Sequence, residues 1–255
     1  MINRLVRSYR SRGKKIGVVA VDPTSPYTGG AVLGDRIRMA DTGVDPGVFI
    51  RSMATRGHAG GLALATFDAV RVLDAFGMDL VFVETVGAGQ SEVEIATRAH
   101  TTVVVEMPMT GDAVQTMKAG ILEIGDVYVV NKADLGNEDV LVANLKFQLT
   151  PRDGWTPPVI RTAATEGLGI DELANALDKH SAFLDDTGSR RKREIGRARL
   201  EILENAQRLL ARRVSEGSRS GRAFDELAEA VAARRLDPHA AAQKLLHRTD
   251  ARGGI

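Results

Sequence analysis

The sequence predicts an α/β fold, a doubly wound and mostly parallel sheet with flanking helices, followed by a C-terminal helical appendage. Short apolar runs alternate with helical patterns as far as position 185, and the runs are rich in Val and Ile with little polar alternation. Such runs are typical of parallel strands buried on both faces, and strand–helix alternation favours a doubly wound sheet. Because the pattern is purely helical afterwards, we expect an α/β domain over residues 1–185 and a helical tail over 186–255.

Six strands are predicted from the apolar runs. They are Ile16–Val21, Val48–Arg51, Leu80–Glu84, Thr102–Met107, Val127–Val130 and Val159–Thr162. The helices expected between them are Leu33–Asp41, Gly60–Phe76, Glu92–Ala99, Ala113–Leu122, Asp139–Leu149 and Asp171–Leu184.

The tail is expected to contain three helices. Apolar residues fall on one face of the first, namely Ile195, Ile202, Leu203, Ala206, Leu209, Leu210 and Val214. Gly217–Gly221 should end this helix, Phe224 and Leu227 belong to a second, and Asp237-Pro238 has the form of the N-cap and first turn of a third. From Asp186 onward 16 Lys and Arg stand against 10 Asp and Glu. This excess is either a solvated face or a contact surface for an acidic partner.

Composition excludes several classes of function. The 255 residues include no cysteine, which excludes disulfides, thiolate metal sites and cysteine nucleophiles. A net charge of +1 provides no general attraction for nucleic acid. No apolar run approaches the ~20 residues of a membrane span, and the basic segment Met1–Lys15 lacks the apolar core of a signal peptide. We therefore expect a cytoplasmic protein with neither a nucleic-acid nor a membrane partner.

The clearest chemical motif is Asn131-Lys132-Ala133-Asp134, directly after a predicted strand. A carboxylate at Asp134 can accept hydrogen bonds from guanine N1–H and from its exocyclic amine, whereas adenine would leave the carboxylate unpaired. Asn131 is expected to hold the loop and touch the purine, and the Lys132 stem to cover the base. The alternative is a plain polar turn, but the position after a strand favours a guanine-reading loop.

A second motif runs from Asp79 to Gly87, where a hydrophobic strand ends in an acid and a glycine follows three residues later. An acid at the carboxyl end of a strand lies where nucleotides bind in open sheets. We expect Glu84 to hold Mg²⁺ through water or to position the attacking water, and Gly87 to offer its N–H to a γ-phosphate. Gly89 and Gln90 would belong to a mobile switch. An ordinary strand-to-helix turn is the alternative.

Three further predictions rest on weaker signals. Asp22 ends a buried strand, so its carboxylate needs a partner such as a metal-bound phosphate. Asp35 is a candidate catalytic group and Mg²⁺ ligand, although helix capping and pairing with nearby arginines explain it equally well. Thr162 and Ala163 end the last strand, where the Ala163 N–H could face guanine O6.

Taken together, the order and spacing of these motifs resemble the MeaB/ArgK family of the SIMIBI class of GTPases over nearly the whole chain. The matching blocks are Val21–Ser25, Gly29–Met39, Val83–Glu92, Thr110–Lys118 and Asn131–Asp134. The resemblance implies GTP/GDP and Mg²⁺ as cofactors, a homodimer formed through the C-terminal helices, and an adenosylcobalamin-dependent mutase as partner. It also implies that Asp112, Gln115 and Lys118 belong to a switch loop that passes the nucleotide state to the mutase.

The phosphate-binding loop of that family, Gly-x-x-Gly-x-Gly-Lys-Ser/Thr, does not occur in the 255 residues. Gly13–Lys15 precedes a strand and lacks the first glycine and the hydroxyl. Counting back from Asp22 places the loop immediately before Met1 and makes Ile2–Ser11 the remainder of its helix. We therefore expect a truncated product or a start site assigned too far downstream, with an unpaired edge on both strands beside the missing one. GTP binding should be weak and hydrolysis negligible.

Several functions remain possible. The favoured one is a GTP-hydrolysing chaperone that delivers cobalamin to a mutase such as methylmalonyl-CoA mutase and protects it, with Mg²⁺, Glu84 and Asp22 around an attacking water. A module that dimerises or docks on the mutase without turnover is the alternative, and the apolar face of the tail could instead pack on its own domain. A nickel-delivery GTPase usually shows Cys/His motifs, which this chain lacks. A transport-associated kinase or ATPase, the historical label of the ArgK branch, conflicts with a guanine-reading Asp134.

Overall fold

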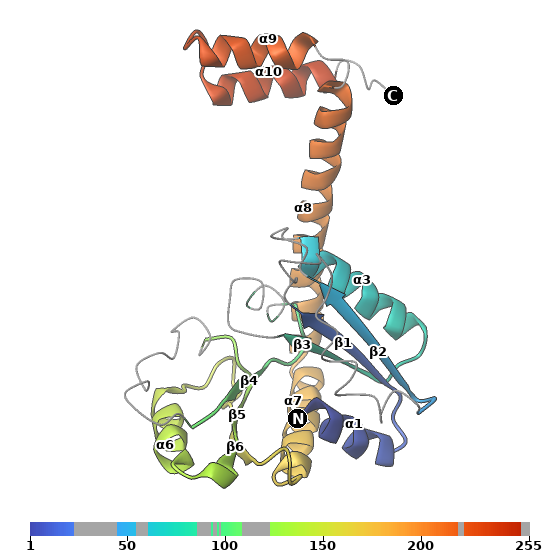
Figure 1. Cartoon of the computed structure of the whole chain (residues 1–255), viewed down its shortest axis with the longest axis vertical. Coiled ribbons are helices and arrows are strands. Elements are labelled where there is room, and N and C mark those ends of the chain that lie inside the picture. The colour runs from blue at the N-terminus through green and yellow to red at the C-terminus, as the bar shows by residue number, and fades with distance from the viewer. Residues whose placement is uncertain are drawn as a thin grey trace. The chain divides into compact units, whose positions relative to one another are not determined.

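The structure, a computed structural model, describes residues 1–22, 45–54, 61–85, 93, 96, 98–108, 123–218 and 222–250. The chain divides into two compact units, Met1–Arg193 and Glu194–Ile255. The first unit contains every described strand, and the second is helical (Figure 1). The division lies within helix α8 (Ser189–Ser218), a few residues beyond the domain boundary proposed from the sequence.

Six strands form two three-stranded parallel sheets in the first unit, each strand where an apolar run predicts it. They are β1 (Ile16–Asp22), β2 (Val48–Ala54), β3 (Leu80–Thr85), β4 (Val103–Glu106), β5 (Val127–Asn131) and β6 (Val159–Thr162). The strands pair in two halves, β2-β1-β3 and β4-β5-β6, and every pairing is parallel. The predicted fold class and all six strands are therefore confirmed, with ends that differ by a few residues.

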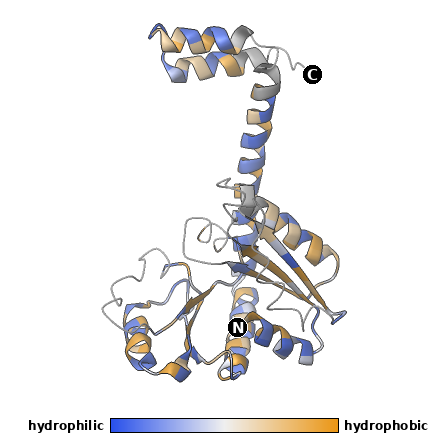
Figure 2. Cartoon of the chain, in the orientation of Figure 1, coloured by the Kyte–Doolittle hydropathy of each residue, from blue (hydrophilic) through white to orange (hydrophobic). Residues whose placement is uncertain are grey.

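Helices cover both faces of the sheet. On one face, α1 (Ile2–Ser11) and α7 (Ile170–Asp186) share a core cluster with alternate residues of β1 and β5. On the opposite face, α3 (Gly61–Ala75) packs on the other residues of β1, and α6 (Glu138–Gln148) packs on those of β5. Figure 2 shows the strands as mainly hydrophobic, in contrast to the mixed colouring of the helices. This alternation of buried faces is the doubly wound arrangement that the sequence predicts.

Strands β3 and β4 are the inner edges of the two half-sheets. Within the described part of the chain β3 pairs only with β1, and β4 pairs only with β5. The two halves are nevertheless held together, because the α1–α7 core cluster includes residues of β1, β2, β5 and β6. Among the described residues, β2, β3, β4 and β6 each pair on one side only, and the two open edges expected from the sequence remain a prediction.

Some of the predicted helices of the first unit are described by the structure, and others lie outside the described residues. Helices α3, α6 and α7 confirm three predictions, and α1 has the bounds expected for the N-terminal helix. The predicted helices Leu33–Asp41 and Ala113–Leu122, and most of Glu92–Ala99, lie outside the described residues.

The second unit consists of helices whose boundaries follow the predicted signals. Besides α8 these are α9 (Arg222–Ala232) and α10 (Pro238–Asp250). The Asp237 carboxylate accepts a hydrogen bond from the Ala240 backbone N–H at 2.9 Å, which confirms it as the N-cap of α10. Apolar residues on α8 are exposed, among them Ile195, Ile202, Leu203, Leu209 and Leu210. None of the helices in the described ranges is long and apolar enough to cross a membrane.

Candidate functional site

The parallel strands bring several predicted site residues to one edge of the sheet. Glu84 lies near the carboxyl end of β3 and is in register with Ala20 of β1. Asn131 ends β5 and is in register with Thr162, the last residue of β6. Since carboxyl ends of parallel strands share one edge, this is where an α/β sheet binds ligands.

The Asn131 side chain joins the loop after β5 to the loop after β6 by hydrogen bonds. Its side-chain oxygen accepts a hydrogen bond from the Thr162 hydroxyl at 3.0 Å and from the Ala164 backbone N–H at 3.3 Å. Because both partners donate, the assignment of the amide oxygen is fixed and the amide nitrogen remains a donor for a purine. Thr162 is fully buried, so its hydroxyl needs this partner. Asn131 therefore connects the loop after β5 to the loop after β6.

The residues after Asn131 form a tight exposed turn. Lys132 adopts the left-handed conformation with φ of 60° and begins the 3₁₀ helix η2 (Ala133–Leu135). Asp134 lies in the first turn of that helix and is exposed. In the described part of the chain neither a hydrogen bond nor an ion pair engages its carboxylate. The carboxylate is consequently available to a ligand, and two adjacent N–H donors such as those of guanine suit it.

The loop after β6 differs from the sequence-based expectation in one respect. The Ala163 backbone N–H donates to the Leu168 carbonyl oxygen at 3.1 Å, and the Ala163 carbonyl accepts from Glu166 and Gly167. The loop thus closes on itself, and the Ala163 N–H is not available to guanine O6. The Ala164 N–H, with its longer bond to Asn131, is the nearest alternative donor.

Glu84 acts electrostatically on the Met1 amino group, which precedes α1. Burial lowers the pKa of the Met1 amino group, and the nearby negative charge of Glu84 acts in the opposite direction. A second acid, Glu106, ends β4 at the same edge, and burial raises the pKa of its carboxyl group. The sequence analysis did not select Glu106, although it ends a hydrophobic strand as Glu84 nearly does.

The other predicted site residues lie outside the described residues. These are Asp35, Gly87, Gly89, Gln90, Asp112, Gln115 and Lys118, together with the side chain of Asp22. In the ranges that the structure covers, no three His, Asp or Glu side chains are grouped closely enough to hold a metal ion. Of the three candidate Mg²⁺ ligands, only Glu84 has a side chain among the described residues.

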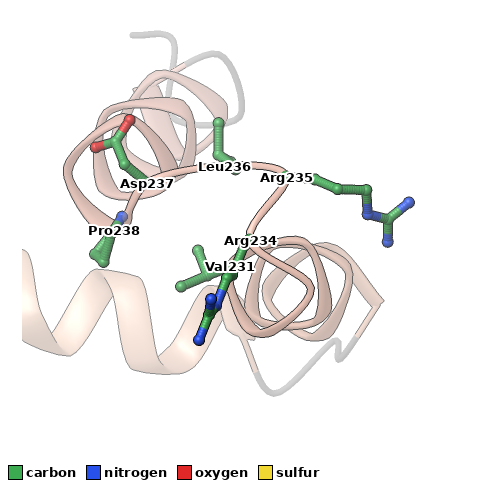
Figure 3. Close-up of a pocket in the computed structure, with 6 residues that line it drawn as sticks. All are labelled: Val231, Arg234, Arg235, Leu236, Asp237 and Pro238. Carbon is green, nitrogen blue, oxygen red and sulfur yellow. The ribbon is translucent and has the colours of Figure 1, made fainter.

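A separate pocket of about 430 Å³ lies at the turn between α9 and α10 (Figure 3). Its lining residues are Val231, Arg234, Arg235, Leu236, Asp237 and Pro238. Arg235 points away from the other five (Figure 3), and the pocket contains none of the predicted site residues. It therefore adds nothing to the site at the strand ends.

Comparison with known proteins agrees with this geometry. The family model described as methylmalonyl Co-A mutase-associated GTPase MeaB matches residues 1–219. A Pyrococcus abyssi protein with a provisional GTPase name is 45% identical over 252 residues, which cover 96% of this chain and 78% of the relative. GTPase ArgK of Escherichia coli is 37% identical over 183 residues, 69% of this chain and 55% of that protein.

The fold also matches a solved structure. The crystal structure of a LAO/AO transport system kinase aligns with a TM-score of 0.65 at 24% identity, covering 95% of this chain and 74% of that one. At this identity the match concerns the fold alone. Family model, relatives and fold agree, and the chain belongs to the MeaB family of GTPases.

Proposed function

We propose that this chain is a cytoplasmic GTP-binding and GTP-hydrolysing chaperone of an adenosylcobalamin-dependent acyl-CoA mutase, which it helps to load with cofactor and to protect. GTP binding and hydrolysis are impaired in the 255 residues, because these contain no Gly-x-x-x-x-Gly-Lys-Ser/Thr loop. The observation that carries the nucleotide part is the braced loop pair, with Asn131 held by Thr162 and Ala164 and with the Asp134 carboxylate exposed. The mutase part is supported by the description of the matching family model, which names a mutase-associated GTPase.

Base recognition follows from hydrogen-bond chemistry. Asp134 would accept the N1–H and amine of guanine, Asn131 would donate to the purine, and the Lys132 stem would cover the ring. Adenine would place an acceptor against the Asp134 carboxylate and leave that carboxylate without a donor. A site that hydrogen-bonds one base in this way discriminates strongly against the other.

We assign the phosphates of the nucleotide to the part of the site where carboxylates lie at or after the strand ends. We assign Mg²⁺ contacts to Glu84, Asp22 and Asp35, because carboxylate oxygens suit this ion, and bound Mg²⁺ would neutralise charge on the phosphates. Glu84 would orient the attacking water. The N–H of Gly87 would face a γ-phosphate, and Gly89 and Gln90 would respond to it.

The nucleotide state would reach the mutase through a separate loop. We assign Asp112, Gln115 and Lys118 to this loop, on the strength of the family resemblance of Thr110–Lys118. Loss or gain of the γ-phosphate would alter the loop and thereby the affinity for the mutase.

The decisive experiment separates base recognition from phosphate binding. Because the 255 residues contain no Gly-x-x-x-x-Gly-Lys-Ser/Thr, we expect base recognition without tight triphosphate binding. Titration of the ¹⁵N-labelled chain with guanosine and with adenosine, each to millimolar concentration, should shift amides at 131–135 and 162–168 with guanosine only. A fluorescent GTP analogue with Mg²⁺ should show no saturable binding in the micromolar range.

Either expectation can fail by itself. Equal shifts with both nucleosides would remove the guanine-reading site and leave a mutase-binding or dimerisation module as the better proposal. Guanosine-selective shifts together with micromolar GTP binding would mean that this chain holds the phosphates without that loop.

Partner binding needs its own measurement. We propose that the exposed apolar residues of α8, such as Ile202 and Leu209, form a homodimer interface. Sedimentation equilibrium should give a dimer that the double substitution Ile202→Glu/Leu209→Glu converts to a monomer. Calorimetric titration with purified methylmalonyl-CoA mutase, with and without GDP, would then test the chaperone role directly, and absence of binding in both states would contradict it.

A further inference from the structure

Arg4, in the first turn of α1, reaches the loop that follows β6. Its guanidinium Nη2 donates a hydrogen bond to the Thr165 carbonyl oxygen at 2.6 Å, although the two residues lie 161 positions apart. The same guanidinium lies 3.7 Å from the point where a Cβ would stand on Gly167, whose φ is +84°. Arg4 therefore occupies the outer side of the closed turn formed by residues 163–168.

This turn is directly connected to Asn131. Thr165 follows Ala164, whose N–H donates to the Asn131 side chain at 3.3 Å. The dipeptide Ala164-Thr165 is thus held at both ends, at the Ala164 N–H by Asn131 and at the Thr165 carbonyl oxygen by Arg4. A charged donor forms a stronger hydrogen bond to a carbonyl than a neutral donor does, so Arg4 limits how far the turn can move away from Asn131.

A line of polar contacts fixes α1 on α7 beyond Arg4. The Ser8 hydroxyl donates to Asp171 at 2.7 Å, the Tyr9 hydroxyl to Asp178 at 2.9 Å, and the Arg12 guanidinium to Asp178 at 2.7 Å. Residues spaced by four lie on one face of a helix, so Arg4 and Ser8 of α1, together with Arg12 at its C-cap, form one polar seam. These contacts fix the position of α1 on α7, and with it the position of Arg4 relative to the loop after β6.

We infer that Arg4 is a positioning residue for guanine recognition, which holds the turn after β6 against Asn131 so that the base-reading loops keep their shape before a nucleotide arrives. This inference rests on the proposed function for the identity of the ligand, but the contact itself does not depend on any ligand.

The test compares two substitutions in the same polar seam, one at Arg4 in α1 and one at Arg12, the C-cap of α1. Arg4→Met keeps most of the aliphatic stem and removes the guanidinium, and Arg12→Met removes a comparable seam contact far from the turn. Hydrogen exchange of the nucleotide-free chain, followed by mass spectrometry, should show amides of 163–168 exchanging about tenfold faster in Arg4→Met. Arg12→Met should leave them unchanged, and Arg4→Lys, which keeps a charged donor, should restore part of the protection.

The guanosine titration gives a second readout. Arg4→Met should reduce the guanosine-over-adenosine preference several-fold while Arg12→Met retains it. Unchanged exchange in Arg4→Met, or equal acceleration in both variants, would overturn the positioning role. If the wild-type chain shows no guanosine preference, the proposed function fails, whereas the exchange result still decides whether Arg4 holds the turn.

Discussion

At the scale of single residues, the site depends on one amide side chain. Asn131 connects the ends of β5 and β6 through the hydroxyl of Thr162 and the N–H of Ala164. The amide oxygen thus binds the protein itself, and the amide nitrogen is the part of the side chain that can donate to a ligand. A ligand that accepts a hydrogen bond from this nitrogen meets a group whose orientation is already fixed.

Substitution of Asp134 should change which base is recognised. Asp134→Asn replaces one acceptor oxygen by a donor, which suits the C2 carbonyl of xanthine and not the amine of guanine. We expect the affinity for guanosine, measured from the amide shifts, to fall by at least about tenfold, and we expect xanthosine to induce amide shifts of its own. The measurement is a nucleoside titration followed by amide chemical shifts, with Asp139→Asn on α6 as control. Retained guanosine preference in Asp134→Asn would exclude this carboxylate from base recognition.

Local sequence was a good guide to some residues and not to others. Asn131 and Asp134 belong to one contiguous motif after a strand, so the sequence alone predicted their placement. The contact of Arg4 with Thr165 joins residues 161 positions apart, and no local pattern indicates such a pair. The internal use of the Ala163 N–H depends on how residues 163–168 close, which the motif does not specify.

At the scale of elements, two arginines fasten the start of α8. Arg193 donates to both carboxylate oxygens of Asp126, at 2.9 and 3.1 Å, and to the His100 carbonyl at 2.7 Å. Arg190 pairs with Asp185 near the end of α7. The environments differ, because the Asp126 side chain is 6% exposed and that of Asp185 is 56% exposed.

The two arginines should therefore differ in their contribution to stability. Arg193→Met leaves a buried carboxylate without its bidentate partner, and we expect a loss of about 2 kcal/mol, less than for a fully buried pair because Arg193 is partly exposed. Arg190→Met should cost less than about 1 kcal/mol. Urea unfolding of both variants measures the difference, and equal losses would contradict the distinction.

The beginning of α7 depends on a glycine. Gly169 has φ of +73°, and a Cβ at this position would lie 2.0 Å from the Arg161 carbonyl oxygen. Gly169→Ala should cost roughly 3 kcal/mol or more, since it adds a clash with backbone to an unfavourable φ. Gly188 has φ of +68° with open space around it, so Gly188→Ala should cost only about 1 kcal/mol. Thermal unfolding of Gly169→Ala and Gly188→Ala measures both losses of stability. The larger loss expected in Gly169→Ala reports the clash, because both variants share the cost of a positive φ.

Element types were predictable because each has a local cause. Runs of Val and Ile marked the strands, and Asp237-Pro238 marked the start of α10. The division of the strands into β2-β1-β3 and β4-β5-β6 has no local signal in the sequence, because strand order depends on tertiary packing.

At the scale of the whole first unit, a buried histidine makes stability depend on pH. His180 is fully buried beside Thr101, Asp126 and Trp155. Burial lowers its pKa; Asp126 opposes this, whereas Arg193, Arg190 and Arg152 lower the pKa further. The unfolded chain therefore takes up a proton, near pH 6.5, more readily than the native protein does.

The sign of the effect follows from this difference. Above about pH 6.5 the contribution of neutral His180 is fully present, and it is lost as the pH falls, by at most about 1.4 kcal/mol per pH unit. His180→Gln should flatten the dependence of unfolding free energy on pH between about 5 and 7. His239→Gln, at an exposed histidine, should retain the wild-type slope. An unchanged slope in His180→Gln would assign the acid sensitivity to other groups.

The junction between the two half-sheets has a mechanical consequence. Within each half-sheet, backbone hydrogen bonds hold neighbouring strands together. Between the two halves, the described contacts are side-chain packing and the polar seam between α1 and α7. In a force-spectroscopy experiment with handles attached at β2 and β6, the molecule should yield first between β3 and β4, at low force. The two three-stranded pieces would then extend as separate rigid bodies before either one unravels.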